Sequence, residues 1–269
     1  MKRYLWAGAL VFGMALFPMG FRPLSVQRGA VAAEAGKGQA RKGIDPDADR
    51  ILRGMTDYLS SLQSFQVDSA ALDEVVTTSG QKFQIATESE VSVQRPNRLR
   101  SEQVGAHNGM GFWYDGKTMT LECKANGTYG TLQAPPTIDA TIDKARKEFQ
   151  IDAPGADLIY SQPYDVLTEQ VKSGQFIGRE TMDGGPVNHI ALAGEEVDLQ
   201  LWIKDGPEPL PVRYSITTKV TKGEPEFSVH LTQWKTKTAI PASTFQFKAP
   251  EGATRSQSFP RTCSPGRAG

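Results

Sequence analysis

A two-residue alternation of apolar and polar side chains is the feature that most constrains the fold of this chain. It is clearest around the stretch LWIKDGPEPLPVRY, residues 201–214. The apolar positions are Leu199, Leu201 and Ile203 before the turn, and Tyr214 and Ile216 after it. Because successive side chains of a strand point to opposite faces, this spacing predicts an antiparallel hairpin with one apolar face.

The turn of this hairpin contains Pro207, Pro209 and Pro211. Proline cannot donate a ladder hydrogen bond, so the three residues confine the break in pairing to a turn or to the edge of a sheet. Trp202 and Arg213 fall on the polar side of the two strands, where an indole can stack on a guanidinium across the hairpin.

The same alternation recurs at 83–93, 112–123 and 227–234, and two helical patterns interrupt it. The first helix begins after Asp45 as N-cap with Pro46 in its first turn, and its apolar residues recur every three or four positions up to Leu62. The second follows Thr137 as N-cap and extends to Phe149. A short third helix is predicted over 163–171.

The two ends of the chain differ in composition from its middle. Lys2 and Arg3 precede a short apolar run, which predicts a cleaved signal peptide over residues 1–33. Residues 34–43 read as a flexible leader, and 254–269 as a disordered tail. Between them, 44–253 is long enough to form a single domain with its own core.

Charge and cysteine content narrow the class of protein. Cleavage after residue 33 would remove four basic side chains and no acidic ones from a neutral chain, leaving a net charge of −4. That balance argues against a nucleic-acid partner. Cys123 continues an apolar strand face and is interpreted as a small buried residue, with a disulfide to Cys263 as the alternative.

Catalytic signatures are weak. His107, His189 and His230 are far apart and have no metal-ligand spacing, so neither a metal nor a cofactor is expected. The segment from Ser79 to Lys82 matches the serine acyl-enzyme pattern S-x-x-K, but Gly80 places it in a turn instead of at a helix start. We therefore expect a protein that is not an enzyme.

About a dozen antiparallel strands in one sheet would have to curl, because large twisted sheets do not stay flat. The concave apolar face of such a sheet must be covered, and the amphipathic helices are the segments available to cover it. The fold class expected is α+β, an unclosed antiparallel half-barrel with covering helices.

Several segments in combination resemble a known family over most of residues 44–253. They are RPNRLR (95–100), WYDGKTMTL (113–121), APPTIDATIDKA (134–145), GADLIYSQPYDVL (155–167), VDLQLWIKDGPEPLPVRYSITTK (197–219) and FQFKAPEGA (245–253). The chain resembles the DUF2092-like proteins, a domain-of-unknown-function family of bacterial periplasmic proteins, which is similar in turn to the LolA and LolB lipoprotein carriers. The resemblance implies a LolA-like half-barrel around an apolar cavity, and no catalytic residues.

These observations lead to the functional hypothesis of an exported, periplasmic protein that binds or carries a lipid or the acyl chain of a lipoprotein. The alternative is an envelope sensor or scaffold that binds a partner protein through its outer surface. In a tightly filled barrel the cavity-lining candidates would simply be core. They are Phe83, Ile85, Val91, Phe112, Tyr114, Leu121, Leu199, Leu201, Ile203, Tyr214 and Ile216.

Overall fold

The computed structural model describes residues 43–104, 109–151, 153–256 and 259, so the predicted signal peptide and nearly all of the leader lie outside the described residues. One sheet of twelve strands dominates it, in the order β12-β6-β5-β4-β3-β2-β1-β11-β10-β9-β8-β7. The strands are β1 (Ser64–Val76), β2 (Lys82–Gln94), β3 (Arg98–Val104), β4 (Met110–Tyr114), β5 (Thr118–Cys123), β6 (Thr128–Gln133), β7 (Val171–Met182), β8 (Gly185–Gly194), β9 (Val197–Lys204), β10 (Pro211–Thr218), β11 (Glu226–Lys235) and β12 (Thr254–Arg255).

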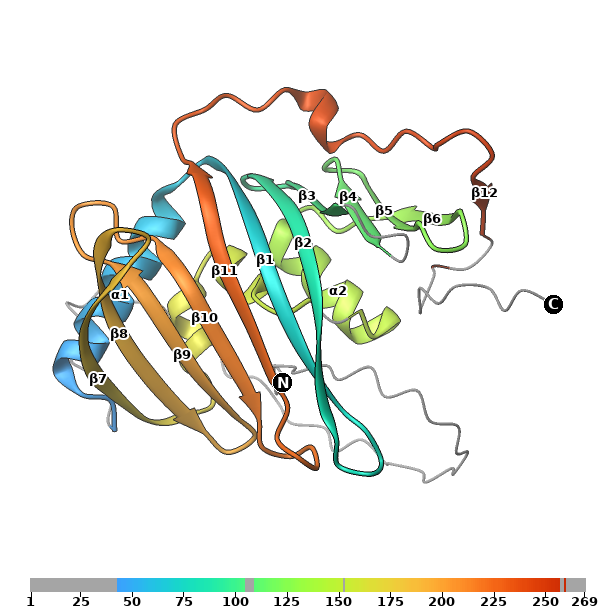
Figure 1. Ribbon diagram of the computed structural model, residues 1–269. Helices are drawn as coiled ribbons and strands as arrows, with labels where there is room; N and C mark the ends of the chain where they lie inside the picture. The colour runs from blue at the N-terminus through green and yellow to red at the C-terminus, as the bar shows by residue number, and fades with distance from the viewer. Residues whose placement is uncertain (1–42, 105–108, 152, 257–258, 260–269) are drawn as a thin grey trace, which may run out of the picture.

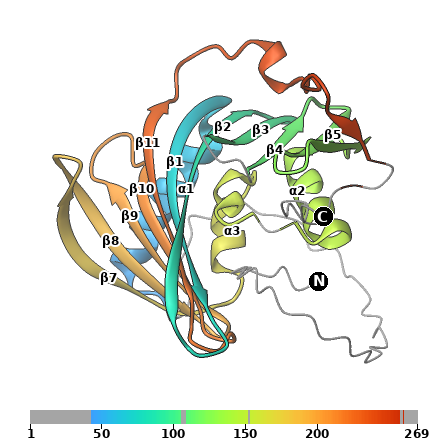
Figure 2. The ribbon, with the colours of Figure 1, turned by 45° about the vertical axis from the view of Figure 1, so that its right-hand side comes forward.

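The sheet is an unclosed half-barrel. Its end strands, β7 and β12, do not pair with each other, and the strands curve around one side of the molecule (Figures 1 and 2). Neighbouring strands are antiparallel except for β12, which pairs with β6 in parallel. The expected fold class, an open antiparallel half-barrel with covering helices, is confirmed.

The helices begin where the capping residues predicted. Helix α1 (Pro46–Ser61) is capped by the Asp45 carboxylate, which accepts hydrogen bonds from two first-turn amides. Helix α2 (Ile138–Phe149) is capped by the Thr137 hydroxyl. A 3-10 turn, η1 (Ala156–Ile159), and α3 (Pro163–Thr168) follow. Within the described part of the chain, no helix is both long and apolar enough to cross a membrane.

Strands β9 and β10 form the predicted hairpin with the three-proline turn. Leu201 pairs with Tyr214, and Leu199 pairs with Ile216. A bulge between Pro211 and Arg213 follows the proline turn. The predicted stacking is present on the sheet face opposite Leu201 and Tyr214. There the Arg213 guanidinium carbon lies 5.2 Å from the centre of the Trp202 ring.

The segment after β11 crosses the outer face of β3–β6, where Phe247 packs against Trp113 and Tyr129 at centroid distances of 4.9 and 5.0 Å. Thr254–Arg255 then adds β12 to the edge of β6, and Phe259 is buried. The expectation of disorder from residue 254 was therefore wrong for these positions. The polar composition of the segment gave no sign that two of its residues pair with the edge strand β6 or that Phe259 is buried.

Cys123, at the end of β5, is fully buried and disulfide-bonded. The interpretation of this residue as only a small buried side chain is therefore incomplete. Cys263 lies outside the described residues.

Candidate functional site

The candidate site is the concave face of the half-barrel, the sheet face on which Leu201 and Tyr214 lie. A single insertion between β6 and β7, residues 134–170, lies over it and contains α2, η1 and α3 (Figure 2). We call this insertion the cover. Helix α1 lies beside it against the β7–β8 end of the same face.

Nine of the eleven predicted lining residues belong to this apolar interior. Val91 and Phe112 are partly buried and pack against the main core. The other seven are at most 5% exposed, and they are Tyr114, Leu121, Leu199, Leu201, Ile203, Tyr214 and Ile216. Six of these seven belong to the main core, whereas Leu121 forms a smaller cluster with Met119 and Phe259. The alternation of the strands therefore identifies most of the concave face.

Phe83 and Ile85 are the exceptions, with exposures of 46% and 50%. The hairpin of β1 and β2 extends beyond its neighbours, since β11 pairs with β1 only as far as Asp73 and β3 pairs with β2 only from Glu88. Among the described strands, only β1 pairs with the far part of β2. The prediction that these two residues line the interior is therefore wrong for this structure.

The interior is filled by side chains of the sheet and of the helices together. Leu52 and Met55 of α1, Ile138 of α2, and Val166 and Leu167 of α3 belong to the same core as the concave strands. Each of these five side chains is at most 5% exposed. Among the described residues the concave face is therefore filled by side chains, and the apolar cavity expected from the resemblance is absent from this structure.

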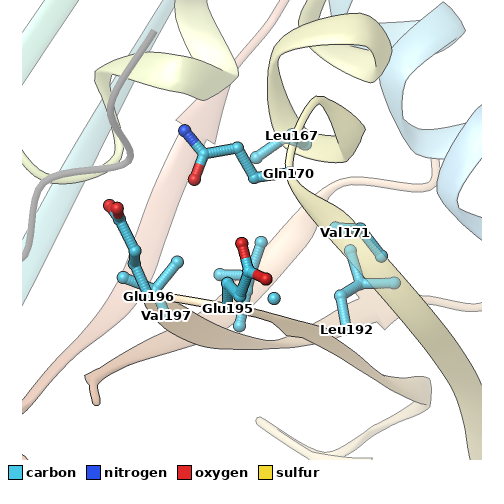
Figure 3. A pocket seen from close by; sticks show the side chains of 9 residues that line it. Leu167, Gln170, Val171, Leu192, Glu195, Glu196 and Val197 are labelled. Atoms are coloured by element: carbon cyan, nitrogen blue, oxygen red, sulfur yellow. The ribbon is translucent and has the colours of Figure 1, made fainter. Parts of the chain in front are cut away.

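A small hollow marks the seam between the cover and the sheet (Figure 3). Its volume is about 10 Å³, which is close to the minimum for one water molecule. Leu167, Val171 and Leu192 form its apolar wall, and Glu195 and Glu196 of the β8–β9 turn stand at its rim. The hollow is too small for a ligand. It lies at the boundary between the apolar interior and the polar surface of the protein.

Polar contacts inside the cover make it one unit. Arg146 of α2 forms an ion pair with Asp157 of η1 at 2.8 Å, with side-chain exposures of 15% and 6%. The Tyr160 hydroxyl donates to Asp143 at 2.8 Å, and the Ser161 hydroxyl donates to Asp139 at 2.6 Å. Because these contacts join successive parts of the insertion, α2, η1 and the residues up to Ser161 are expected to move together.

Three side chains of the described part of the sheet donate hydrogen bonds to the cover. The Tyr114 hydroxyl donates to the carbonyl oxygen of Pro135 at 2.6 Å, and the Tyr214 hydroxyl donates to that of Pro154 at 3.2 Å. Gly155 follows with φ 82°, and a Cβ there would lie 1.8 Å from the Tyr214 hydroxyl oxygen. The sheet and the cover therefore leave no room for a side chain between Gly155 and Tyr214.

Arg95, at the turn between β2 and β3, is the third of these side chains. Its Nη1 donates to the carbonyl oxygen of Ile159 at 2.8 Å, and its Nη2 donates to that of Tyr160 at 3.3 Å. Its Nε is buried, and no described atom accepts from it. Burial lowers the pKa of Arg95, and the more distant charge of Asp139 opposes that shift.

Sequence reasoning missed Arg95 as a functional residue. It precedes Pro96 in a turn, where an arginine is usually solvated, and its partners lie 64 and 65 residues further along the chain. Only a prediction of how the insertion folds back over the sheet would have found this contact.

Helix α1 is attached to the cover through α3. Arg53 forms an ion pair with Asp49 at 2.8 Å and also donates to the Tyr164 hydroxyl at 2.7 Å, while that hydroxyl donates to Asp49. The guanidinium lies over the Tyr164 ring at 3.8 Å. This contact joins the two helical parts that lie over the concave face.

The described residues contain no cluster of three or more potential metal ligands. Ser79 lies in the β1–β2 turn, where its hydroxyl contacts that of Thr77 at 2.8 Å. Lys82 forms an ion pair with Glu74 at 2.7 Å. The two residues are therefore held by other partners and do not form the serine–lysine pair of an acyl-enzyme.

Solved structures with a similar chain course include two mycobacterial proteins. LprF from Mycobacterium bovis is 18% identical, with 73% of this chain and 97% of that chain covered and a TM-score of 0.45. The lipoprotein LppX from Mycobacterium tuberculosis is 16% identical, with 73% and 98% covered and a TM-score of 0.48.

A LolA superfamily protein from Nitrosomonas europaea is 13% identical, with 74% and 97% covered and a TM-score of 0.35. Likenesses this distant carry no argument about function. None of the curated proteins compared with the chain matches it.

A family model provides the firmer assignment. It matches residues 48–257, which include nearly all of α1, the whole of α2 and α3, and every strand of the sheet. The match also contains the proline hairpin, the cover and Arg95. The chain therefore belongs to the family described as "Predicted periplasmic protein (DUF2092)".

Proposed function

We propose that this protein is an exported, non-enzymatic binding protein for a hydrophobic ligand, either a lipid or the acyl chain of a lipoprotein. In this proposal residues 1–33 are a cleaved signal peptide, and the ligand binds to the concave face in place of the cover. The periplasmic description of the family and the continuous apolar surface under the cover support it.

The observation that carries the proposal is the contact of Arg95 with the cover. Arg95 is partly buried, and burying a charge without a carboxylate partner is costly. Arg95 instead contacts two carbonyl oxygens, and its Nε remains unsatisfied. The contact that holds the cover against the sheet therefore carries a desolvation cost. Because this cost reduces the net stabilisation of the covered form, we infer that a form with the cover displaced lies within a small free-energy difference of it.

The energies are compatible with such an exchange. Burial of a methylene group contributes about 0.8 kcal/mol, so an acyl chain of about twelve methylenes would contribute about 10 kcal/mol before ordering costs. Each hydrogen bond between cover and sheet contributes a net ~1 kcal/mol. A bound acyl chain would thus offset the loss of these hydrogen bonds and part of the apolar contacts of the cover.

Native mass spectrometry of protein purified without detergent tests this function. We expect a population that carries an added mass of lipid, which disappears after organic extraction. Repeated preparations from the native envelope without any added mass would contradict the proposal.

A scaffold that binds a partner protein remains the second candidate, because Phe83 and Ile85, which share the strand face of Val91, are half exposed on a part of β2 that pairs only with β1 among the described strands. Under this alternative the filled interior is permanent. Substitution of both residues by serine would then abolish capture of a partner protein while leaving the lipid content unchanged.

A further inference from the structure

The outer face of the sheet, opposite the cover, carries a hollow that is independent of the concave face. It lies over β1, β2 and β11 and is bounded by the turn between β7 and β8. Its volume is about 870 Å³, which is within the range of small-molecule pockets. We call it the outer groove.

Small side chains create the outer groove. Ala70 of β1 is paired with Glu88 of β2 on one side and with His230 of β11 on the other. In the next outward-facing row, Leu72 is paired with Ala86 and Ser228. The floor of the groove is therefore formed mostly by short apolar side chains. The larger side chain of Glu88 stands on one long side, and those of Arg213 and His230 stand on the other.

The turn between β7 and β8 forms the end wall. Asp183 and Gly184 both have positive φ, 52° and 74°, as a tight two-residue hairpin turn requires. Asp183 contacts His230 Nε2 at 2.7 Å, and Met182 packs beside Trp202 and Val212. The tip of this hairpin is therefore attached to the outer face.

Arg213 provides a fixed positive charge at the same end. It is paired directly with His230 and with Trp202, and its guanidinium is held at the Trp202 ring. Among the described residues, no carboxylate lies within salt-bridge distance of this guanidinium. The acid of the end wall, Asp183, already contacts His230.

We propose that the outer groove binds an anionic amphiphile, a molecule with a carboxylate or phosphate head and an alkyl tail. The head contacts the Arg213 guanidinium, and the tail lies across Ala70, Leu72 and Ala86. Neighbouring strands are about 4.8 Å apart, so the three steps from β10 to β2 span about 14 Å, enough for a medium-length chain. The carboxylate of Glu88 lies on β2, on the side of the groove away from Arg213, so the anionic head is placed at Arg213 and the tail at the β2 side. The Arg213 charge and the apolar floor together select this class over a neutral lipid.

Methyl NMR of the purified protein tests the proposal, with decanoate and decanol as probes and alanine, leucine and isoleucine methyl groups as reporters. Decanoate should shift the Ala70 and Ala86 methyl signals along a saturable curve, and decanol should bind at least tenfold more weakly. Arg213→Gln should weaken decanoate binding about tenfold or more, because a hydrogen-bonded charge pair is lost.

The matched control is Arg179→Gln, which removes the same charge from a 71% exposed arginine outside the groove and should leave the affinity unchanged. Ala70→Leu, which fills the floor, should also abolish the shift at Ala86. Equal effects of the two arginine variants, equal binding of decanol, or no shift at Ala70 and Ala86 would overturn the proposal. Shifts confined to Leu201 and Ile216 would do the same while supporting the concave site.

Discussion

Arg95 of the β2–β3 turn donates a 2.8 Å hydrogen bond to the carbonyl oxygen of Ile159, and this contact joins the rim of the sheet to the cover. Of the three side chains in the described part of the sheet that donate hydrogen bonds to the cover, Arg95 is the charged one. Tyr114 and Tyr214 donate through neutral hydroxyls.

Arg95→Met tests whether this contact holds the cover closed. The variant removes the charge and leaves the carbonyl oxygens of Ile159 and Tyr160 without this donor, so we expect the free energy of unfolding to fall by about 1–3 kcal/mol. Fluorescence of the dye ANS, which reports exposed apolar surface, should rise under native conditions. Arg50→Met, at a 70% exposed side chain, is the control. Equal ANS fluorescence of the two variants would show that the Arg95 contact does not hold the cover against the sheet.

Gly155→Ala tests the close approach of the cover to Tyr214. The added Cβ would collide with the hydroxyl oxygen and would also strain a backbone with positive φ. Gly80→Ala is the matched control, because Gly80 has a similar φ of 86° with nothing within 4 Å of the added atom. Thermal unfolding should show a larger loss for Gly155→Ala, and Tyr214→Phe should recover part of the difference. Equal losses of thermal stability in the two variants would mean that the cover moves away from Tyr214 at no measurable cost.

Ile203→Ala and Ile85→Ala test the division of the predicted lining set. Ile203 is 1% exposed in the core, so its truncation should cost about 2–5 kcal/mol. Ile85 is half exposed, and its truncation should cost less than about 1 kcal/mol. Urea unfolding provides both values, and similar costs would show that β2 packs differently in solution.

Glu102 and Glu122 should affect the pH dependence of stability in opposite directions. Burial opposes ionisation of Glu102, but hydrogen bonds from Lys124 and Arg100 outweigh it and lower its pKa. Burial raises the pKa of Glu122, with Lys124 opposing that shift and Glu102 adding to it. The stabilisation from Glu102 is thus present above its unfolded-state pKa and is lost as pH falls through the folded one.

For Glu122 the sign is reversed, since its stabilising effect is present at low pH and is lost as pH rises through its folded pKa. Glu102→Gln should therefore be less stable than the wild type at neutral pH, and Glu122→Gln more stable. Both differences should shrink as the pH approaches about 3, below the ordinary pKa of glutamate. Urea unfolding across this range checks the pair, and a shared sign at neutral pH would refute the assignment.

Local patterns predicted the parts of the fold that depend on neighbouring residues. The alternation around Leu201 and Tyr214 predicted both the hairpin and its inward face, and Asp45 and Thr137 marked the helix starts. The patterns could not show how far adjacent strands overlap, so Phe83 and Ile85 were assigned to an interior that their neighbours do not reach.

The remaining features depend on long-range contacts. Arg95 becomes important only because the insertion folds back to it, and the outer groove has its end wall because the tip at Asp183 reaches His230. Whether the lining residues are core or binding surface also depends on the position of the cover, which no periodicity specifies.

Photo-crosslinking with a diazirine-bearing fatty acid tests the central claim most directly, because it reports where an acyl chain lies. Residue-level mass spectrometry should place the adducts on inward-facing residues such as Leu201 and Ile216 and on Ile142 of the cover, with a higher yield in Arg95→Met. An absence of adducts at inward-facing positions in both proteins, with or without labelling of the outer face at Ala70, would contradict the account.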